Sequence, residues 1–414
     1  MQHSATAATG GPLRERLTLA IMFATWGLVF LDRMSVLYLA PYIARDLHLD
    51  DAQVGMLAGV VAVSWAVSAL LFGALSDRVG RKVVLVPMVL LFSIVSALSG
   101  LAHSYGQLLG LRVLLGVLEG PCWSVMMALV EDNSAPEHRG RNIGVVVSAA
   151  ALIGLAVAPV LTTQVAAAAG WRDAFFIAAA PGVVLAVLIA TCVRESRDFR
   201  ERTPVRRTWR RDILQMLRYP NLWASACGAA GFMSWLFLVN AFGPLYITTV
   251  LHQSGTTAGF LMGAAGLGSF IIGLLAPAIS DRAGRRVTLI VCAALSIVLP
   301  LALLMKVSAL HLWLLAGVLF CTQTGQALSA ICIVLVPTES VPRHLAATAI
   351  GFATLFGELI GGFAAPLVAG SLAQQHGLSV PLWMAAGGGF VVLLAALALR
   401  PAARMPAEAR SAAH

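Results

Sequence analysis

The sequence predicts an all-α integral membrane protein in which twelve transmembrane helices form two pseudo-symmetric six-helix bundles. Three observations predict this fold. Of the 414 residues, 59% are hydrophobic and only 11% are charged, which is too few charges to cover a soluble particle of this size. The chain divides into about twelve apolar runs, and a membrane core about 30 Å thick needs about 20 helical residues per crossing. A charged motif also recurs half a chain apart.

The recurring motif lies between the second and third apolar runs of each half. Residues 73–82 read GALSDRVGRK and residues 277–286 read PAISDRAGRR, so the two copies are 204 positions apart. Both keep Ser-Asp-Arg-x-Gly-Arg followed by a basic residue. A motif repeated at half the chain length indicates an internal duplication.

The apolar runs define the predicted spans and domains. Spans are expected near 17–42, 52–75, 82–103, 105–130, 142–168, 171–193, 221–250, 256–279, 286–306, 309–336, 345–371 and 379–399. They give a first bundle over 17–193 and a second over 221–399. Tails at 1–16 and 400–414 flank them, and a basic linker at 194–220 joins them.

The distribution of basic residues predicts the orientation. With both termini in the cytoplasm, 23 Lys and Arg residues lie in cytoplasmic segments, against three on the other side. Two lysines among many arginines and alanines are typical of a GC-rich bacterial genome, so we expect a multi-pass protein of the cell inner membrane. The net charge of +9 is spread over short connectors, which excludes the basic face of a nucleic-acid binder.

Five ionisable residues are expected inside spans: Asp32, Arg33, Arg112, Glu119 and Glu358. A charge at mid-bilayer costs roughly 2.5 to 3.5 kcal/mol, so these side chains should face one another or a water-filled cavity. Arg112 and Glu119 are about two helical turns apart and share a face. Asp32 and Arg33 point about 100° apart, so one can face a pocket while the other braces a neighbouring helix. The alternative is a set of fixed ion pairs that only pack the bundle.

The two charged connections resemble the signature loop of the major facilitator superfamily. The resemblance rests on the span count, the basic linker, the repeat and the motif, and it implies bundles that rock about a central site. Its residues are Gly73, Asp77, Arg78, Gly80 and Arg81 in the first copy, and Asp281, Arg282, Gly284 and Arg285 in the second, where Pro277 replaces the glycine. We expect them to form a conformational latch that holds the outward-open state, in which Arg81 pairs with Asp77. The alternative is a pair of positive loops that only fix topology.

A closer resemblance is to the anion:cation symporter branch of this superfamily. It rests on Phe30-Leu31-Asp32-Arg33 and on Arg112-x-x-x-Gly116-x-x-Glu119-Gly120-Pro121. The resemblance implies that Asp32 and Glu119 are the proton-coupling carboxylates. It also implies that Arg33 contacts a substrate anion and that Arg112 pairs with the carboxylates as they change protonation.

This sequence departs from the branch where hydroxyl-binding groups are usual. Phe30 and Ser35 replace Tyr and Asn, and the pattern Tyr-Ala-x-x-Gln reads Trp65-Ala66-Val67-Ser68-Ala69. A less polar site favours carboxylates with few hydroxyl groups, aromatic acids among them. The further candidates for substrate contact are Trp65, Asn240, Gln323 and Glu358.

We therefore expect a secondary active transporter that takes up a small organic anion with protons. The alternative is an exporter of drugs or metabolites by proton antiport, although residues 154–159, GLAVAP, lack most glycines of the exporter motif. A membrane enzyme is not expected, since no nucleophile, base or metal cluster has suitable spacing. The expected partners are the anion, protons and lipid, without nucleic acid, metal or cofactor, and the protein is expected to be a monomer.

Overall fold

The computed structural model describes residues 12–195, 215–305, 312–342 and 345–400. In this part of the chain the secondary structure is helical, without strands. Twelve helices are long and apolar enough to cross a membrane, and each corresponds to one of the predicted spans. The predicted fold class is therefore confirmed. The predicted tails and most of the linker lie outside the described residues, so their limits stay predictions.

Six membrane-spanning helices belong to the first half of the chain. The fifth of them is continuous through three labelled segments, whose middle segment is a wider π-helix. The elements are α1 (Pro12–Tyr38), α2 (Ala40–Asp46), α3 (Asp51–Val79), α4 (Arg81–Ser99), α5 (Tyr105–Asp132), η1 (Pro136–His138), α6 (Arg139–Ala149), the π-helix η2 (Ala150–Val157), α7 (Ala158–Ala169) and α8 (Trp171–Cys192).

The second half repeats this arrangement. Its tenth and eleventh spans each contain a π-helical segment. The elements are α10 (Pro220–Thr249), α11 (Gly255–Ala283), α12 (Arg285–Leu304), α13 (Leu312–Thr322), α14 (Gly325–Ser329), the π-helix η5 (Ala330–Leu335), α15 (Val336–Ser340), α16 (Ala346–Phe356), the π-helix η7 (Gly357–Ala364), α17 (Ala365–His376) and α18 (Ser379–Ala398).

The backbone preserves the duplication in detail. Among the described residues, those with positive φ occur in three pairs, 204 or 207 positions apart. They are His48 with His252, Gly80 with Gly284, and Gly170 with Gly377. The π-helices η2 and η7 also begin 207 positions apart. Such wide turns are frequent at functional sites, and here they lie at matching places in the two halves.

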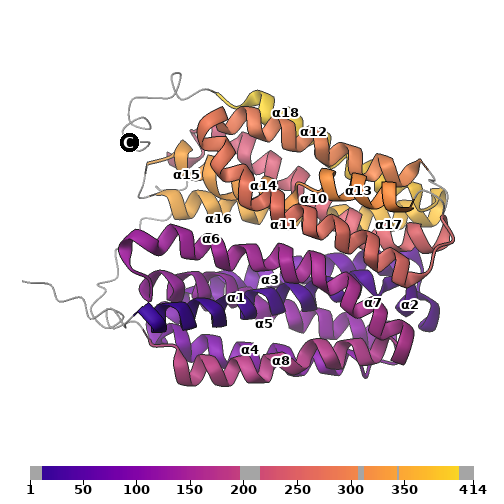
Figure 1. Ribbon diagram of the computed structural model, residues 1–414, viewed down its shortest axis with the longest axis horizontal. Coiled ribbons are helices and arrows are strands. Elements are labelled where there is room, and N and C mark those ends of the chain that lie inside the picture. Colours follow the sequence, from indigo (N-terminus) through magenta and orange to yellow (C-terminus); the bar gives the residue numbers. More distant parts are fainter. Residues whose placement is uncertain (1–11, 196–214, 306–311, 343–344, 401–414) are drawn as a thin grey trace, which may run out of the picture.

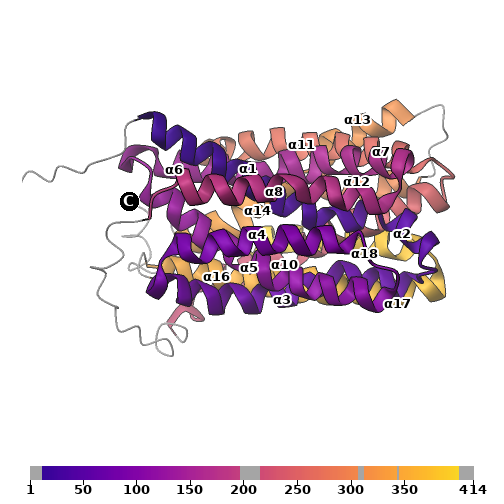
Figure 2. The ribbon, with the colours of Figure 1, turned by 90° about the horizontal axis from the view of Figure 1, so that it is seen from below.

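The two halves form two layers of helices that meet along one interface. Figure 1 shows the first half, from indigo to magenta, beside the second half, from orange to yellow. In Figures 1 and 2 the described chain begins and ends at the same end of the molecule, here called the terminal end. The short helix α2 lies at the opposite end, here called the far end.

Backbones of the two bundles pack closely at the far end. A Cβ atom added to Gly55 on α3 would lie 2.3 Å from the carbonyl oxygen of Pro366 on α17. One added to Gly259 on α11 would lie 2.6 Å from the carbonyl oxygen of Pro159 on α7. Glycines at these crossings allow the helices to approach.

The terminal end is different. Gly144 on α6 and Gly351 on α16 have nothing within 4 Å of an added Cβ atom. Neither glycine packs against a helix of the other bundle. The bundles therefore meet at the far end and separate toward the terminal end.

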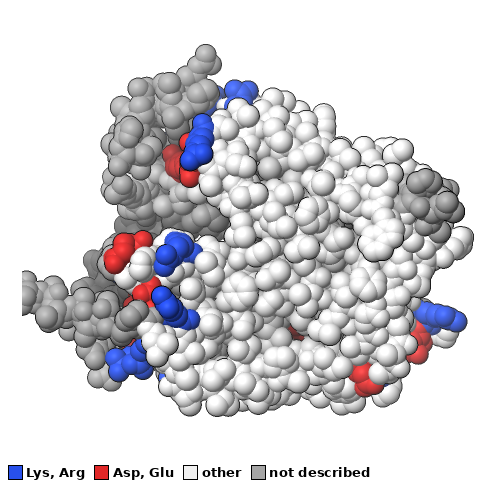
Figure 3. Space-filling view, viewed as in Figure 1, with Lys and Arg blue, Asp and Glu red and all other residues white. Residues whose placement is uncertain are grey.

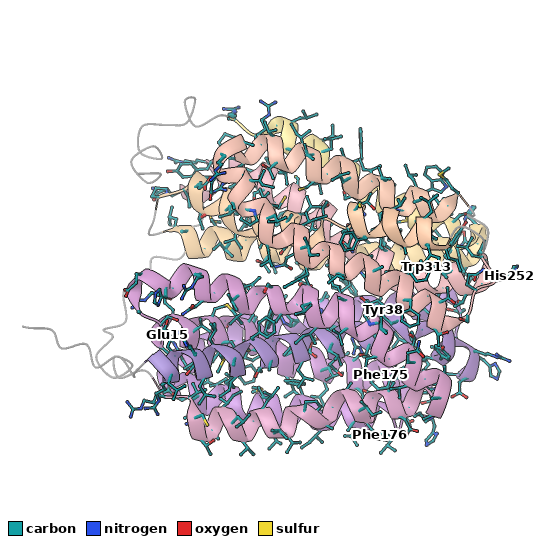
Figure 4. All side chains as sticks on the ribbon, viewed as in Figure 1. Glu15, Tyr38, Phe175, Phe176, His252 and Trp313 are labelled. Atoms are coloured by element: carbon teal, nitrogen blue, oxygen red, sulfur yellow. The ribbon has the colours of Figure 1, made fainter. Side chains whose placement is uncertain are left out.

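The surface is apolar between two charged ends. Figure 3 shows Lys, Arg, Asp and Glu gathered at the two ends, with a broad belt of other residues between them. In Figure 4, Glu15 marks the terminal end, Trp313 and His252 mark the far end, and Tyr38 lies where the two bundles meet. This pattern is what a protein that crosses a membrane along its long axis requires.

Candidate functional site

Five charged side chains lie buried inside the membrane-spanning helices. Asp32 and Arg33 come from α1, Arg112 and Glu119 from α5, and Glu358 from η7. Each is 5% exposed or less. These are the five residues that the sequence predicts inside spans, and the structure brings them together along the bundle interface.

Arg33 and Glu358 form an ion pair between the two bundles. The distance from Arg33 Nη2 to Glu358 Oε2 is 2.7 Å, and both side chains are buried. Removing one partner of a buried ion pair costs about 3 to 5 kcal/mol, because the other charge is left uncompensated. The pair therefore favours the present arrangement of α1 and η7.

Aromatic rings surround the Arg33 guanidinium. Its Cζ lies 5.6 Å from the ring centroid of Trp65 on α3 and 5.1 Å from that of Phe237 on α10. Both distances are within the range of cation–π attraction. Gly362 makes room for this arrangement, because an added Cβ would lie 2.8 Å from Glu358 Oε2 and 2.9 Å from Ala62 Cβ.

Asp32 points into the first bundle, away from its neighbour Arg33. The hydroxyl of Ser96 on α4 donates a hydrogen bond to Asp32 Oδ1. Asp32 also interacts electrostatically with Glu119 and Arg112. Asp32 therefore contacts other helices of the first bundle, while Arg33 faces the second bundle. This agrees with the angle of about 100° between neighbouring side chains of a helix.

Several polar atoms of this cluster lack a hydrogen-bond partner within the described protein. Arg112 Nη2 donates to the backbone carbonyl of Arg33 at 2.9 Å, but its Nε and Nη1 have no acceptor. The other atoms without a partner are Asp32 Oδ2, both carboxyl oxygens of Glu119, Arg33 Nε and Trp65 Nε1. Buried polar atoms left unpaired cost about 1 to 3 kcal/mol each, and more when charged. Such a cost is expected where a ligand or proton completes the site.

The first latch loop is built around Gly80 and Arg81 at the start of α4. Gly80 has a φ of 111°, a conformation that favours glycine. Arg81 forms an ion pair with Asp132 at the end of α5, and its Nη1 donates to Ala128 O at 2.8 Å. The surroundings of Gly73 and the side chains of Asp77 and Arg78 lie outside the described part, so the Arg81–Asp77 pair stays a prediction.

The second latch loop repeats this geometry. Gly284 has a φ of 89°. Arg285 Nη1 lies 2.6 Å from Asp281 Oδ1, and Arg285 Nη2 lies 2.9 Å from Glu339 Oε1 at the end of the tenth span. Arg282 is exposed. The acidic partners Asp132 and Glu339 are 207 positions apart. In each half, the Arg of the latch loop therefore pairs with an acid at the end of the second membrane-spanning helix after that loop.

The two predicted amides of the second bundle are hydrogen-bonded to other groups of the protein. Asn240 Oδ1 accepts from the hydroxyl of Tyr38 at 2.9 Å, and its Nδ2 donates to Leu236 O at 2.7 Å. Gln323 Oε1 accepts from the backbone N–H of Gly325 at 3.0 Å, at the break between α13 and α14. Substrate contact by either amide stays a prediction.

Sequence reasoning missed three partners that the structure reveals. Ser96 binds Asp32, Tyr38 binds Asn240, and Glu195 caps α4 by accepting from the backbone N–H groups of Arg81 and Lys82 at 2.9 and 2.8 Å. A carboxylate at a helix N-terminus is stabilised by the helix dipole. Asp132 and Glu339 stand at matching positions of the two halves, so a comparison of the halves would have identified them as partners of the loop arginines. No sequence pattern identifies Ser96 or Tyr38 as a partner.

The fold and the site together define a class of protein. Two duplicated six-helix bundles meet around buried charges, and a basic side chain of one bundle pairs with an acid of the other. Inverted or parallel repeats with ionisable groups at their interface are the architecture of secondary transporters. In the described residues, no three His, Cys, Asp or Glu side chains are placed to hold a metal ion.

The chain belongs to the Major Facilitator Superfamily, whose family model matches residues 21–366. It is 28% identical over 405 residues to a probable 4-methylmuconolactone transporter of Cupriavidus pinatubonensis, covering 93% of this chain and 89% of that protein. It is also 28% identical over 275 residues to a probable L-galactonate transporter of Escherichia coli, covering 61% and 60% of the two chains.

A solved structure supports the same fold. The chain superimposes with a TM-score of 0.71, at 19% identity, on a bacterial homologue of the human lysosomal transporter Spinster in an inward-facing, unoccupied conformation. The match covers 94% of this chain and 95% of that one. The protein is therefore a multi-pass membrane transporter with the major facilitator fold.

Proposed function

We propose that the protein takes up a small organic anion together with protons, by alternating access. The observation that carries this proposal is the buried Arg33 at the bundle interface, next to the ring of Trp65, since neither Arg33 Nε nor Trp65 Nε1 has a hydrogen-bond partner among the described residues. A guanidinium edge and an N–H donor are suited to a carboxylate. The position between the bundles allows each bundle to contact the anion as the site opens to either side.

The substrate is a carboxylate with few hydroxyl groups. The rings of Trp65 and Phe237 both lie near Arg33, and they favour a flat, apolar body next to the carboxylate. Ala69 stands where the branch often has Gln, and the neighbouring Ser68 donates its hydroxyl to Val117 O, so this hydroxyl is already engaged. The similarity to a probable 4-methylmuconolactone transporter over 93% of the chain supports a cyclic acid of this kind.

Asp32 and Glu119 are the proposed proton-coupling groups. They are adjacent, buried, and close to Arg112. Two neighbouring carboxyl groups in a site of low dielectric repel when both are ionised, which favours a bound proton. When Arg33 takes up an anion, the change in local charge alters the proton affinity of the pair, which links the two substrates.

The remaining assignments follow the orientation expected from the basic residues. We place the protein as a monomer in the inner membrane with both termini in the cytoplasm. In that orientation the terminal end is cytoplasmic, and the present arrangement is inward-facing. The latch residues around Arg81 and Arg285 then lie at the cytoplasmic end, where we propose that they stabilise the outward-open state.

The test is uptake of labelled acids into proteoliposomes with and without an inward proton gradient. The panel is 4-methylmuconolactone, benzoate, L-galactonate and glucuronate. We expect gradient-driven accumulation of the first two, loss of accumulation in Asp32→Asn and Glu119→Gln, and retention of counterflow exchange in both. Glu137→Gln, which changes an exposed acid at the terminal end, is the matched control. Accumulation only against an opposing gradient would instead establish the antiport exporter.

A further inference from the structure

The charges of the buried cluster do not balance. Three carboxyl groups, Asp32, Glu119 and Glu358, face two guanidinium groups, Arg33 and Arg112. Fully ionised, the cluster carries a net charge of −1, and a bound organic anion would make it −2. Charge in a buried site is costly unless it is paired, so each added negative charge favours the uptake of a proton.

Glu358 occupies part of the edge of Arg33 that an anion would use. A carboxylate binds a guanidinium best through two parallel hydrogen bonds, and Nε with one Nη atom forms such an edge. Glu358 Oε2 accepts a hydrogen bond from Arg33 Nη2 at 2.7 Å, while Arg33 Nε has no partner among the described residues. A substrate carboxylate that binds this edge through both atoms must therefore displace Glu358.

A displaced Glu358 would find no second cation nearby among the described side chains. The elements packed against η7 at this depth are α10, which contributes Phe237, and α3, which contributes Ala62 and Trp65. Among the described residues, the charged group that pairs with Glu358 is Arg33 from α1, and behind Arg33 lie Asp32, Arg112 and Glu119 in the first bundle. An ionised carboxylate released there would have no cationic partner and is unfavourable, whereas a protonated one is tolerated.

We propose that Glu358 is a built-in competitor of the transported anion: it holds Arg33 in the empty carrier, and it takes a proton when the anion replaces it. This inference rests on the proposed function, because it needs Arg33 as the anion site. It adds a third proton-binding carboxyl, in the second bundle, to the two in the first. It also explains why an acid, which would repel an anion, stands in an anion site.

The first test concerns the empty carrier and needs no ligand. The variants are Arg33→Gln, Glu358→Gln and the double variant, and the measurement is thermal unfolding of the full chain in detergent. If the pair forms, each single variant lowers Tm, and the double variant lowers it by less than the sum of the two. Additive losses would show that the pair does not form, and the proposal would fail.

The second test measures the binding of 4-methylmuconolactone as a function of pH. Because Asp32 and Glu119 also titrate, the comparison uses a background with Asp32→Asn and Glu119→Gln, with and without Glu358→Gln. With Glu358 present we expect Kd to rise roughly tenfold per pH unit, the slope of one linked proton. With Glu358→Gln we expect tighter binding and no pH dependence.

The outcomes separate the two proposals. Equal slopes in both backgrounds, or binding weakened by Glu358→Gln as much as by Arg33→Gln, would overturn the role of Glu358 and leave the anion site intact. Lack of binding in every form, wild type included, would count against the anion site and therefore against both proposals. A slope that disappears with Glu358→Gln is a result that a purely structural ion pair does not produce.

Discussion

The hydroxyl of Tyr38 on α1 donates a 2.9 Å hydrogen bond to Asn240 Oδ1 on α10, across the interface of the two bundles. Both side chains are 1% exposed. Asn240 Nδ2 is held by Leu236 O within its own helix, so the amide is oriented toward Tyr38. The bond therefore belongs to this arrangement of the bundles and must break or change if α1 and α10 move apart.

Tyr38→Phe removes this hydroxyl and keeps the ring. Hydrogen bonds between membrane helices contribute about 0.6 to 1.7 kcal/mol, so we expect the balance between the two arrangements of the bundles to shift by about threefold to twentyfold. Distances between spin labels at the terminal end of each bundle measure this shift. The control is Thr162→Val, whose buried hydroxyl donates to Ala158 O within α7 of the first bundle. An equal shift in both variants would contradict the prediction.

Trp65→Phe tests the indole N–H as a substrate ligand. The variant retains an aromatic ring beside Arg33 and loses only the donor Nε1, which has no partner within the described protein. Loss of one hydrogen bond to a charged group costs about 1.5 to 3 kcal/mol, so KM for 4-methylmuconolactone should rise by at least tenfold, with kcat little changed. Trp26→Phe is a matched control. The buried Nε1 of Trp26 also lacks a partner among the described residues, but its ring packs against Trp123 inside the first bundle, away from Arg33. An unchanged KM in Trp65→Phe would assign Trp65 to packing.

The far end contains a pH-dependent contact outside the membrane-spanning segments. Asp46 accepts hydrogen bonds from Arg172 Nη1 at 2.7 Å and from Trp171 Nε1 at 3.1 Å. The bond from Arg172 is the main cause that lowers the pKa of Asp46 below its ordinary value. A lowered pKa in the folded state means that the contact stabilises the protein above the unfolded pKa, near 3.9, and that this contribution is lost as the pH falls through the folded value.

Asp46→Asn should therefore lower Tm slightly at neutral pH. Because the pair is partly exposed, the loss of unfolding free energy should be at most about 1 kcal/mol. The difference in Tm between wild type and variant should disappear below the folded pKa, where Asp46 is protonated. Thermal unfolding in detergent from neutral pH to strongly acid pH measures this, and a difference that persists in acid would contradict the assignment.

The sequence predicts the fold well because membrane helices follow from composition and length. Each of the twelve apolar runs gives a helix, since an unpaired backbone in lipid is too costly. The offset of 204 positions also predicts that Arg81 and Arg285 occupy matching places. What the sequence does not predict is where helices widen, because the residues of η2, η5 and η7 continue the apolar runs around them.

The sequence predicts which charged residues belong to the site, but it does not predict which of them form ion pairs. The cost of burying charge identifies Asp32, Arg33 and Glu358 as functional candidates. Which acid pairs with which base depends on the relative position of α1 and η7, which are more than 300 residues apart in sequence. The sequence names Glu358 as a candidate for substrate contact, with a fixed ion pair as the alternative; in this structure Glu358 pairs with Arg33, and its contact with substrate stays a prediction. Ser96, an ordinary serine in an apolar run, gave no signal before its contact with Asp32 was known.

The close crossing of α3 and α17 gives a last prediction, on the closure of the far end. Gly55→Ala would place a Cβ atom 2.3 Å from the backbone oxygen of Pro366, and backbone cannot move aside as a side chain can. Overpacking of this kind costs about 1 to 3 kcal/mol, so the arrangement closed at the far end should lose population by fivefold to more than a hundredfold. Gly351→Ala is the matched control, because nothing lies within 4 Å of its added Cβ.

The measurement is the rate at which a thiol reagent labels a cysteine introduced at Ala52, which lies against Gly370 in the closed far end, in a chain without other reactive cysteines. We expect faster labelling and slower transport in Gly55→Ala and neither effect in Gly351→Ala. Transport slows because a carrier that alternates between two closures is limited by the less populated one. Faster labelling with unchanged transport would show that closure of the far end does not limit the cycle. Unchanged labelling would show that α3 and α17 do not form the closing contact.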